Sequence, residues 1–120
     1  MVVDDEALIR LVLAEEFADA GFEVVEAASG DEAVALMEAG VRVETVATDV
    51  RMPGARDGVA LAAWMAEHRP GVSVVVVSGY DLPPSAKSAN PAVIAVLPKP
   101  YKPAEIVKLV ADARLTGKSA

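Results

Sequence analysis

The chain has 120 residues, of which 53% are hydrophobic, and its formal net charge is −7. This length suits one compact domain over 1–120, and the absence of cysteine excludes disulfides and Cys-based metal sites. The negative charge argues against a nucleic-acid partner, because a phosphate backbone is bound by clustered Lys and Arg. No apolar run approaches the roughly 20 residues that span a bilayer. We therefore expect a cytoplasmic domain without a membrane partner.

The first half of the chain alternates short strands with helices. Residues 1–3 are predicted as the end of a buried strand, and because so few residues precede the acidic pair, we expect the natural start to lie a few residues upstream. Apolar residues recur at helical spacing in 6–20, and 22–26 is predicted as the second strand. The next helix is capped by Ser29 and closed by Gly40.

The second half continues the same alternation. A third strand is predicted at 43–48, and a helix opens at 57–58. The valine run at 72–77 suits a parallel strand that is covered on both faces. A fifth strand at 93–97 precedes a last helix over 103–115, which begins with proline.

The alternation predicts an α/β fold with an open parallel sheet of five strands joined by right-handed crossovers. The segment 81–91 leaves little room for a fourth helix, because it holds Pro83-Pro84 and ends at Pro91. We expect that helix to be short or irregular.

Chemistry-bearing residues follow the predicted strands. Asp4 and Asp5 follow the first strand, Asp49 the third, Ser78 the fourth and Lys99 the fifth. The carboxyl ends of parallel strands meet at one edge of the sheet, where ligands bind. Three carboxylates there would repel one another unless a cation lay among them, and oxygen ligands at this density suit Mg²⁺. A hydroxyl and an ammonium beside them would contact phosphoryl oxygens, so the set favours phosphoryl transfer to a carboxylate.

Four segments of the chain form a recognisable set of motifs: VVDDE at 2–6, TDVRMPG at 48–54, VVVSGY at 75–80 and PKP at 98–100. They resemble the motifs of response-regulator receiver domains, of the chemotaxis-receiver kind. The resemblance spans essentially the whole chain. It implies a flavodoxin-like, doubly wound (βα)5 fold with strand order 2-1-3-4-5, and a single receiver domain without an output domain.

The resemblance also implies roles for the acidic residues. Asp49 is expected to be the phosphoacceptor. Asp5 would bind Mg²⁺ directly and Asp4 through water, together with Asp49 and the backbone carbonyl of Arg51. Arg51 and Tyr80 would flank the site and tune the access of the hydrolytic water.

The switch residues are implied in the same way. Ser78, followed by Gly79, stands at the position of the switch hydroxyl, and Lys99 at that of the phosphate-pairing lysine. The bond before Pro100 is usually cis in this family, which would aim Lys99 at the site.

The sequence differs from many receiver domains at two places that bear on how the switch signals. Val96 stands where many receivers carry an aromatic residue, so we expect the ordering of 81–91, through Tyr80, to carry the change instead. The Ser-Gly-Tyr motif is similar to that of an alphaproteobacterial receiver subgroup with Phe-Ala-Thr-Gly-Tyr, although Val76-Val77 replaces its Phe-Ala.

The implied partners are a sensor histidine kinase or a phosphotransfer protein, and an unknown downstream protein. The domain would be a monomer or weak dimer that signals by protein contact or acts as a phosphate sink. It would not be an enzyme in the usual sense, although it catalyses its own phosphotransfer and dephosphorylation. The alternatives are a phosphate-independent interaction module with the same fold, and a small phosphoester hydrolase.

Ordinary structural interpretations exist for the same residues. Asp4-Asp5 would cap the first helix, Asp49 would be a turn residue before proline and glycine, and Lys99 a solvated lysine. Away from the acidic edge, His68 is predicted as a solvated helix end, and Trp64 is predicted to pack on the inner face of its helix.

Overall fold

The fold is a five-stranded sheet in which every neighbouring pair of strands is parallel. The computed structural model describes residues 1–50, 58–78, 93–98 and 101–119. The strands are β1 (Val2–Val3), β2 (Glu26–Ala27), β3 (Thr45–Asp49), β4 (Ser73–Ser78) and β5 (Val93–Pro98). Their order is β2-β1-β3-β4-β5, as predicted. Strand β2 therefore lies on one side of β1, and β3, β4 and β5 follow in turn on the other side.

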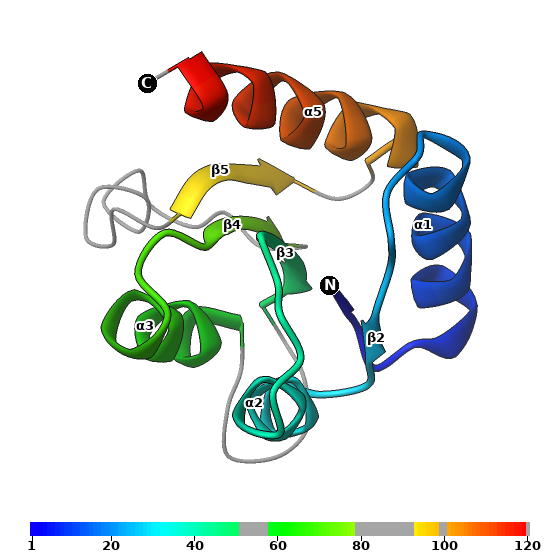
Figure 1. The fold of residues 1–120 in the computed structure, drawn as a ribbon. Helices are drawn as coiled ribbons and strands as arrows, with labels where there is room; N and C mark the ends of the chain where they lie inside the picture. Colours follow the sequence, from blue (N-terminus) through cyan, green and yellow to red (C-terminus); the bar gives the residue numbers. More distant parts are fainter. Residues whose placement is uncertain (51–57, 79–92, 99–100, 120) are drawn as a thin grey trace.

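Helices cover both faces of the sheet, which makes the fold doubly wound (Figure 1). Those in the described ranges are α1 (Ala7–Asp19), α2 (Gly30–Glu38), α3 (Gly58–His68) and α5 (Pro103–Ser119). Helices α1 and α5 lie on one face, and α2 and α3 lie on the other. None of these helices combines the length and the apolar character that crossing a bilayer requires.

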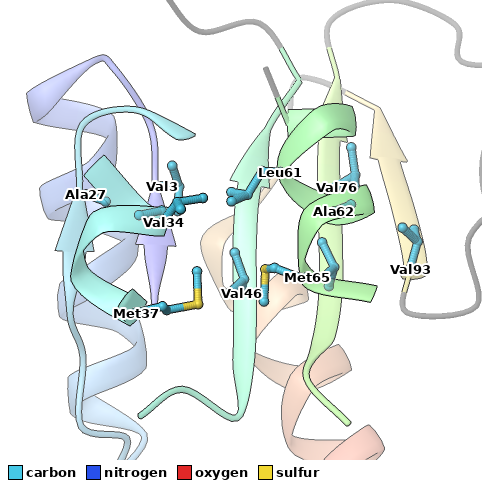
Figure 2. Packing of buried hydrophobic residues seen from close by; sticks show 12 residues of the cluster. Val3, Ala27, Val34, Met37, Val46, Leu61, Ala62, Met65, Val76 and Val93 are labelled. Carbon is cyan, nitrogen blue, oxygen red and sulfur yellow. The ribbon is translucent and has the colours of Figure 1, made fainter. Parts of the chain in front are cut away.

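The sheet has a core on each face. Figure 2 shows the core beneath α2 and α3, where Met37 and Met65 approach Val46 of β3. On the other face, Leu13 and Phe17 of α1 pack with α5 residues such as Ile106 over alternate residues of the strands. Strands β3 and β4 are buried on both faces, and this explains why the interior of β4 is an uninterrupted run of valines.

Local signals placed the ends of α1, α2 and α3 correctly. Ser29 caps α2, since its hydroxyl oxygen accepts the backbone N–H of Glu32 at 3.0 Å. Gly21 and Gly40 follow α1 and α2 with φ values of 95° and 106°, a conformation that a side chain disfavours. Helix α3 begins at Gly58 and ends at His68, also as predicted.

Two strand boundaries were predicted too early. The second strand covers Glu26–Ala27 rather than 22–26, and the third covers Thr45–Asp49 rather than 43–48. A strand is defined by its neighbours: β2 pairs with β1, whose Val2 lies opposite Glu26, and β3 first meets β4 at Thr45. Residues 22–25 and 43–44 come before these paired positions and are not part of a strand.

The last helix is longer than predicted. It runs through to Ser119, four residues beyond Leu115, and includes Thr116 and Gly117. Glycine in a helix costs only about 1 kcal/mol relative to alanine, which is too little to force an end. The short or irregular fourth helix expected within 81–91 lies outside the described residues.

Candidate functional site

The predicted acidic edge lies at the carboxyl ends of β1 and β3. Asp4 follows Val3 directly, and Asp49 is the last residue of β3. Since Val3 pairs with Thr48, these two neighbouring strands end at nearly the same level. Asp4 and Asp49 are therefore brought together by strand pairing, although 45 positions separate them in the sequence.

Three carboxylates meet at this edge. One oxygen each from Asp4, Asp5 and Asp49 can be chosen such that all lie within 4.8 Å of one another. Asp4 is 5% exposed and Asp49 is 7% exposed, whereas Asp5 is open to solvent. Negative charges this close raise each other's free energy when partly buried, and a divalent cation relieves that repulsion. The oxygen donors fit a hard cation such as Mg²⁺.

Asp4 is fixed through both its backbone and its side chain. Its Oδ1 accepts the backbone N–H of Glu6 at 2.8 Å, and its own N–H donates to the carbonyl of Ala27 at 3.1 Å. The ordinary interpretation, in which Asp4-Asp5 cap the first helix, does not describe this bond, because the N-cap of α1 is Glu6 and no side chain caps the helix. The same side chain also belongs to the carboxylate cluster.

Arg10 connects α1 to this edge, which sequence reasoning missed. Its Nη1 donates to the backbone carbonyl of Asp4 at 2.9 Å, and its Nε donates to Glu26 Oε1 at 3.2 Å. An arginine one turn into a predicted helix carries little in the sequence that distinguishes it from a solvated arginine. Its spacing of six residues from Asp4 is the only indication that it could reach back.

The backbone of Asp49 has two further neighbours that the sequence did not reveal. The Thr48 hydroxyl donates to the Asp49 carbonyl oxygen at 2.9 Å. A Cβ on Gly58, at the start of α3, would overlap that same carbonyl oxygen. The next residue, Val50, donates its N–H to Val77 at 3.0 Å and accepts from Gly58 at 2.8 Å.

The remaining predicted site residues fall partly outside the described part of the chain. Ser78 ends β4, with Pro98 of β5 opposite it, so its backbone lies at the expected edge. Val96 is half-buried and packs against the core beneath α2 and α3. The others lie outside the described residues: Arg51, Gly79, Tyr80, Lys99 and Pro100.

Trp64 and His68 lie on α3, away from the carboxylates. Trp64 is half-buried against the core, as predicted, and its ring stacks on the exposed His68 ring at 4.8 Å between centroids. The Arg69 guanidinium lies 5.3 Å from the centre of the Trp64 ring. His68 accordingly belongs to an aromatic stack at a helix end and not to the acidic site.

A cavity of about 800 Å³ lies at the opposite edge of the sheet. Its lining includes Met1, Val25, Val43 and Thr45, which precede or begin β1, β2 and β3. The carboxylates stand at the other ends of these strands, so this cavity does not serve them.

Comparisons with known proteins agree with the fold. Residues 1–111 match the family described as the response regulator receiver domain. The transcriptional regulatory protein PdtaR of Mycobacterium tuberculosis is 37% identical over 113 residues, which are 92% of this chain and 53% of PdtaR. The chain thus spans about half the length of this curated relative.

Solved structures give the same picture. A CheY-like receiver domain from Methanospirillum hungatei JF-1 is similar with a TM-score of 0.87 and 25% identity, over 99% of this chain and 95% of that one. The response regulator TrrA of Thermotoga maritima, solved in complex with Mg²⁺ and BeF, has a TM-score of 0.78 and 26% identity, over 92% and 94% of the two chains.

Proposed function

This chain belongs to the response regulator receiver family of two-component systems, and from this we propose that it is a phosphorylation switch whose phosphoacceptor is Asp49. The observation that carries the proposal is the meeting of Asp4, Asp5 and Asp49 at the carboxyl edge of the sheet. Asp49 is the one of the three that ends a central strand, with β1 and β4 on either side of β3. The strand that carries its carboxylate is therefore paired on both sides.

The acidic cluster suits Mg²⁺. Asp5 and Asp49 would hold the ion, Asp4 would contact it through water, and the Arg51 carbonyl would complete the protein ligands. Bound there, Mg²⁺ supplies positive charge that offsets the charge of the phosphoryl oxygens and of the carboxylates. The TrrA structure, solved with Mg²⁺ and BeF, supports this choice by similarity.

The phosphodonor is a phosphohistidine of a sensor kinase or a phosphotransfer protein. An Asp49 carboxylate oxygen attacks the phosphorus atom, the phosphorus–nitrogen bond of the donor breaks, and the imidazole leaves. Ser78 donates a hydrogen bond to one phosphoryl oxygen and Lys99 neutralises another. Water later hydrolyses the aspartyl phosphate, with Arg51 and Tyr80 controlling its access.

Output follows from the added negative charge. The attraction of Ser78 and Lys99 to the phosphoryl group shifts a two-state equilibrium at the ends of β4 and β5. Because Val96 replaces the aromatic residue of many receivers, we assign the transmitted change to the segment 81–91 with Tyr80. A downstream protein reads that change by direct contact, or the domain competes for phosphoryl groups as a sink.

Acetyl phosphate tests the proposal without knowledge of the kinase. The protein is incubated with acetyl phosphate and MgCl₂, and intact mass is measured before and after mild alkali. The expected result is one added phosphoryl group that alkali removes and that Asp49→Asn does not acquire. An unmodified parent protein, shown to be folded, would contradict the proposal and favour a phosphate-independent interaction module.

The same samples test the hydrolase alternative. Phosphate release from p-nitrophenyl phosphate is followed in parallel with adduct formation. A switch releases phosphate only at the slow rate at which its own aspartyl phosphate hydrolyses. Rapid multiple turnover that Asp49→Asn abolishes would instead identify a phosphoester hydrolase.

A further inference from the structure

We propose that Thr48 is a positioning residue for Asp49: its hydroxyl and the bare Cα of Gly58 hold the Asp49 peptide, and through it the carboxylate, in the acidic cluster. The inference rests on the proposed function, because it assigns a further residue to the same site. Thr48 does not touch the reacting atoms. It acts on the backbone from which the phosphoacceptor side chain projects.

Packing alone does not explain why a hydroxyl is buried at position 48. Thr48 is 1% exposed and stands in a strand whose other interior residues, Val46 and Ala47, are apolar. Valine has nearly the same shape and would avoid burying a hydroxyl. A buried hydroxyl costs free energy unless it is hydrogen-bonded, and here it donates to the carbonyl oxygen of Asp49 at 2.9 Å.

Gly58 closes the other side of the same peptide. A Cβ at this position would overlap the Asp49 carbonyl oxygen and lie 2.9 Å from the Cα of Val50. The Gly58 N–H donates to the Val50 carbonyl at 2.8 Å, which holds the start of α3 against the end of β3. The Asp49 carbonyl is therefore confined by a hydrogen bond and by direct backbone packing.

This confinement is transmitted to the carboxylate through one Cα. Successive side chains of a strand point to opposite faces, so Thr48 belongs to the side of α2 and α3, as Val46 does, and Asp49 to the other side. Rotation of the Asp49 peptide would move its side chain relative to Asp4 and Asp5. Displacements on the order of 1 Å at a reacting group cost up to about 100-fold in rate.

Substitutions at Thr48 separate positioning from packing. Thr48→Val keeps the shape and removes the donor, Thr48→Ser keeps the donor, and Thr45→Val makes the same chemical change at the far end of the same strand. The measurements are Mg²⁺ affinity by calorimetry and the phosphorylation rate with acetyl phosphate at saturating Mg²⁺. Circular dichroism checks that each variant is folded, and Thr48→Ala replaces Thr48→Val if the valine variant is not.

We expect Thr48→Val to weaken Mg²⁺ binding by about fivefold and to slow phosphorylation by about tenfold, the effect of losing one hydrogen bond that matters for geometry. For Thr48→Ser, both the Mg²⁺ affinity and the phosphorylation rate should stay within about threefold of the parent values. For Thr45→Val, both should equal the parent values. Parent-like values for Thr48→Val would overturn the inference, and so would equal losses in the serine and valine variants. If the parent acquires no phosphoryl group, the proposed function fails, while the Mg²⁺ affinities still decide the role of Thr48.

Discussion

The guanidinium of Arg10 donates a hydrogen bond from α1 to the backbone carbonyl oxygen of Asp4, 2.9 Å away. The contact crosses the turn that carries the two acidic residues after β1. A second donor of the same guanidinium reaches Glu26 on β2. One side chain thus ties a helix and two strands together beside the carboxylate cluster.

Replacing Arg10 with lysine should lower the free energy of unfolding by about 1 kcal/mol. An ammonium keeps the charge, but it lacks the fork that reaches Asp4 and Glu26 together. Urea unfolding monitored by circular dichroism measures the difference. Glu26→Gln is the matched control, since it removes only an exposed ion pair worth less than about 1 kcal/mol. A Glu26→Gln loss as large as that of Arg10→Lys would show that the ion pair, and not the contact with Asp4, carries the effect.

Asp5→Asn should raise the melting temperature in the absence of Mg²⁺ and reduce the stabilisation that Mg²⁺ gives. In EDTA the variant should melt roughly 5 °C higher than the parent, because one of three clustered negative charges is removed. Added MgCl₂ should raise the melting temperature of the parent by selective binding to the folded state, and this rise should largely disappear in the variant. Glu15→Gln, an exposed change on α1, should leave both behaviours as in the parent. An unchanged response of Asp5→Asn to Mg²⁺ would exclude Asp5 as a ligand.

Gly58→Ala should damage the site as well as the fold. The added methyl group overlaps the Asp49 carbonyl oxygen, and relief of such overpacking typically costs about 1 to 3 kcal/mol. Because the displaced atom belongs to Asp49, Mg²⁺ affinity should fall too. Gly40→Ala is the matched control: it strains a residue with a φ of 106° but meets no atom within 4 Å. It should lose stability and keep its Mg²⁺ affinity, so equal Mg²⁺ affinities in the two variants would contradict the prediction.

In a chain that begins at Met1, the amino group of Met1 should make stability depend on pH. Burial lowers its pKa from 8.0 to about 6, and it donates to the Thr45 carbonyl at 2.8 Å. Between these values the unfolded chain binds more protons than the folded one, so the free energy of unfolding should rise as pH increases from 6 to 8. The rise should be on the order of 2 kcal/mol at most. Urea unfolding across this range tests it. An Nα-acetylated chain has no such group, and a slope as steep as that of the free amine would locate the dependence elsewhere.

Much of the architecture was predictable because its signals are local. Ser29 and Gly40 bracket α2 by rules that involve only a few neighbouring residues. The clustering of Asp4, Asp5 and Asp49 was predictable as well, since the carboxyl ends of parallel strands share one edge. The early starts given to the second and third strands were wrong, because pairing depends on where a neighbouring strand begins.

The residues that hold the acidic residues in place were not predictable in this way. Apart from the six-residue spacing of Arg10 from Asp4, nothing local indicates that Arg10 turns back to Asp4, that Gly58 meets Asp49, or that the Thr48 hydroxyl donates to a carbonyl. The roles of Arg51, Tyr80, Lys99 and Pro100 stay predictions, since these residues lie outside the described ranges.

The sequence by itself determined the alternation of strands and helices, the sheet, and the three carboxylates, because hydrophobic periodicity, caps and strand ends are written in short stretches of chain. Only the tertiary structure decided the distances between those carboxylates and which groups hold them. A guanidinium, a hydroxyl and a missing Cβ acquire their roles from what packs against them, and packing is set by the whole fold. Asp49 is recognisable from its motif, but its placement depends on β1, β4 and α3.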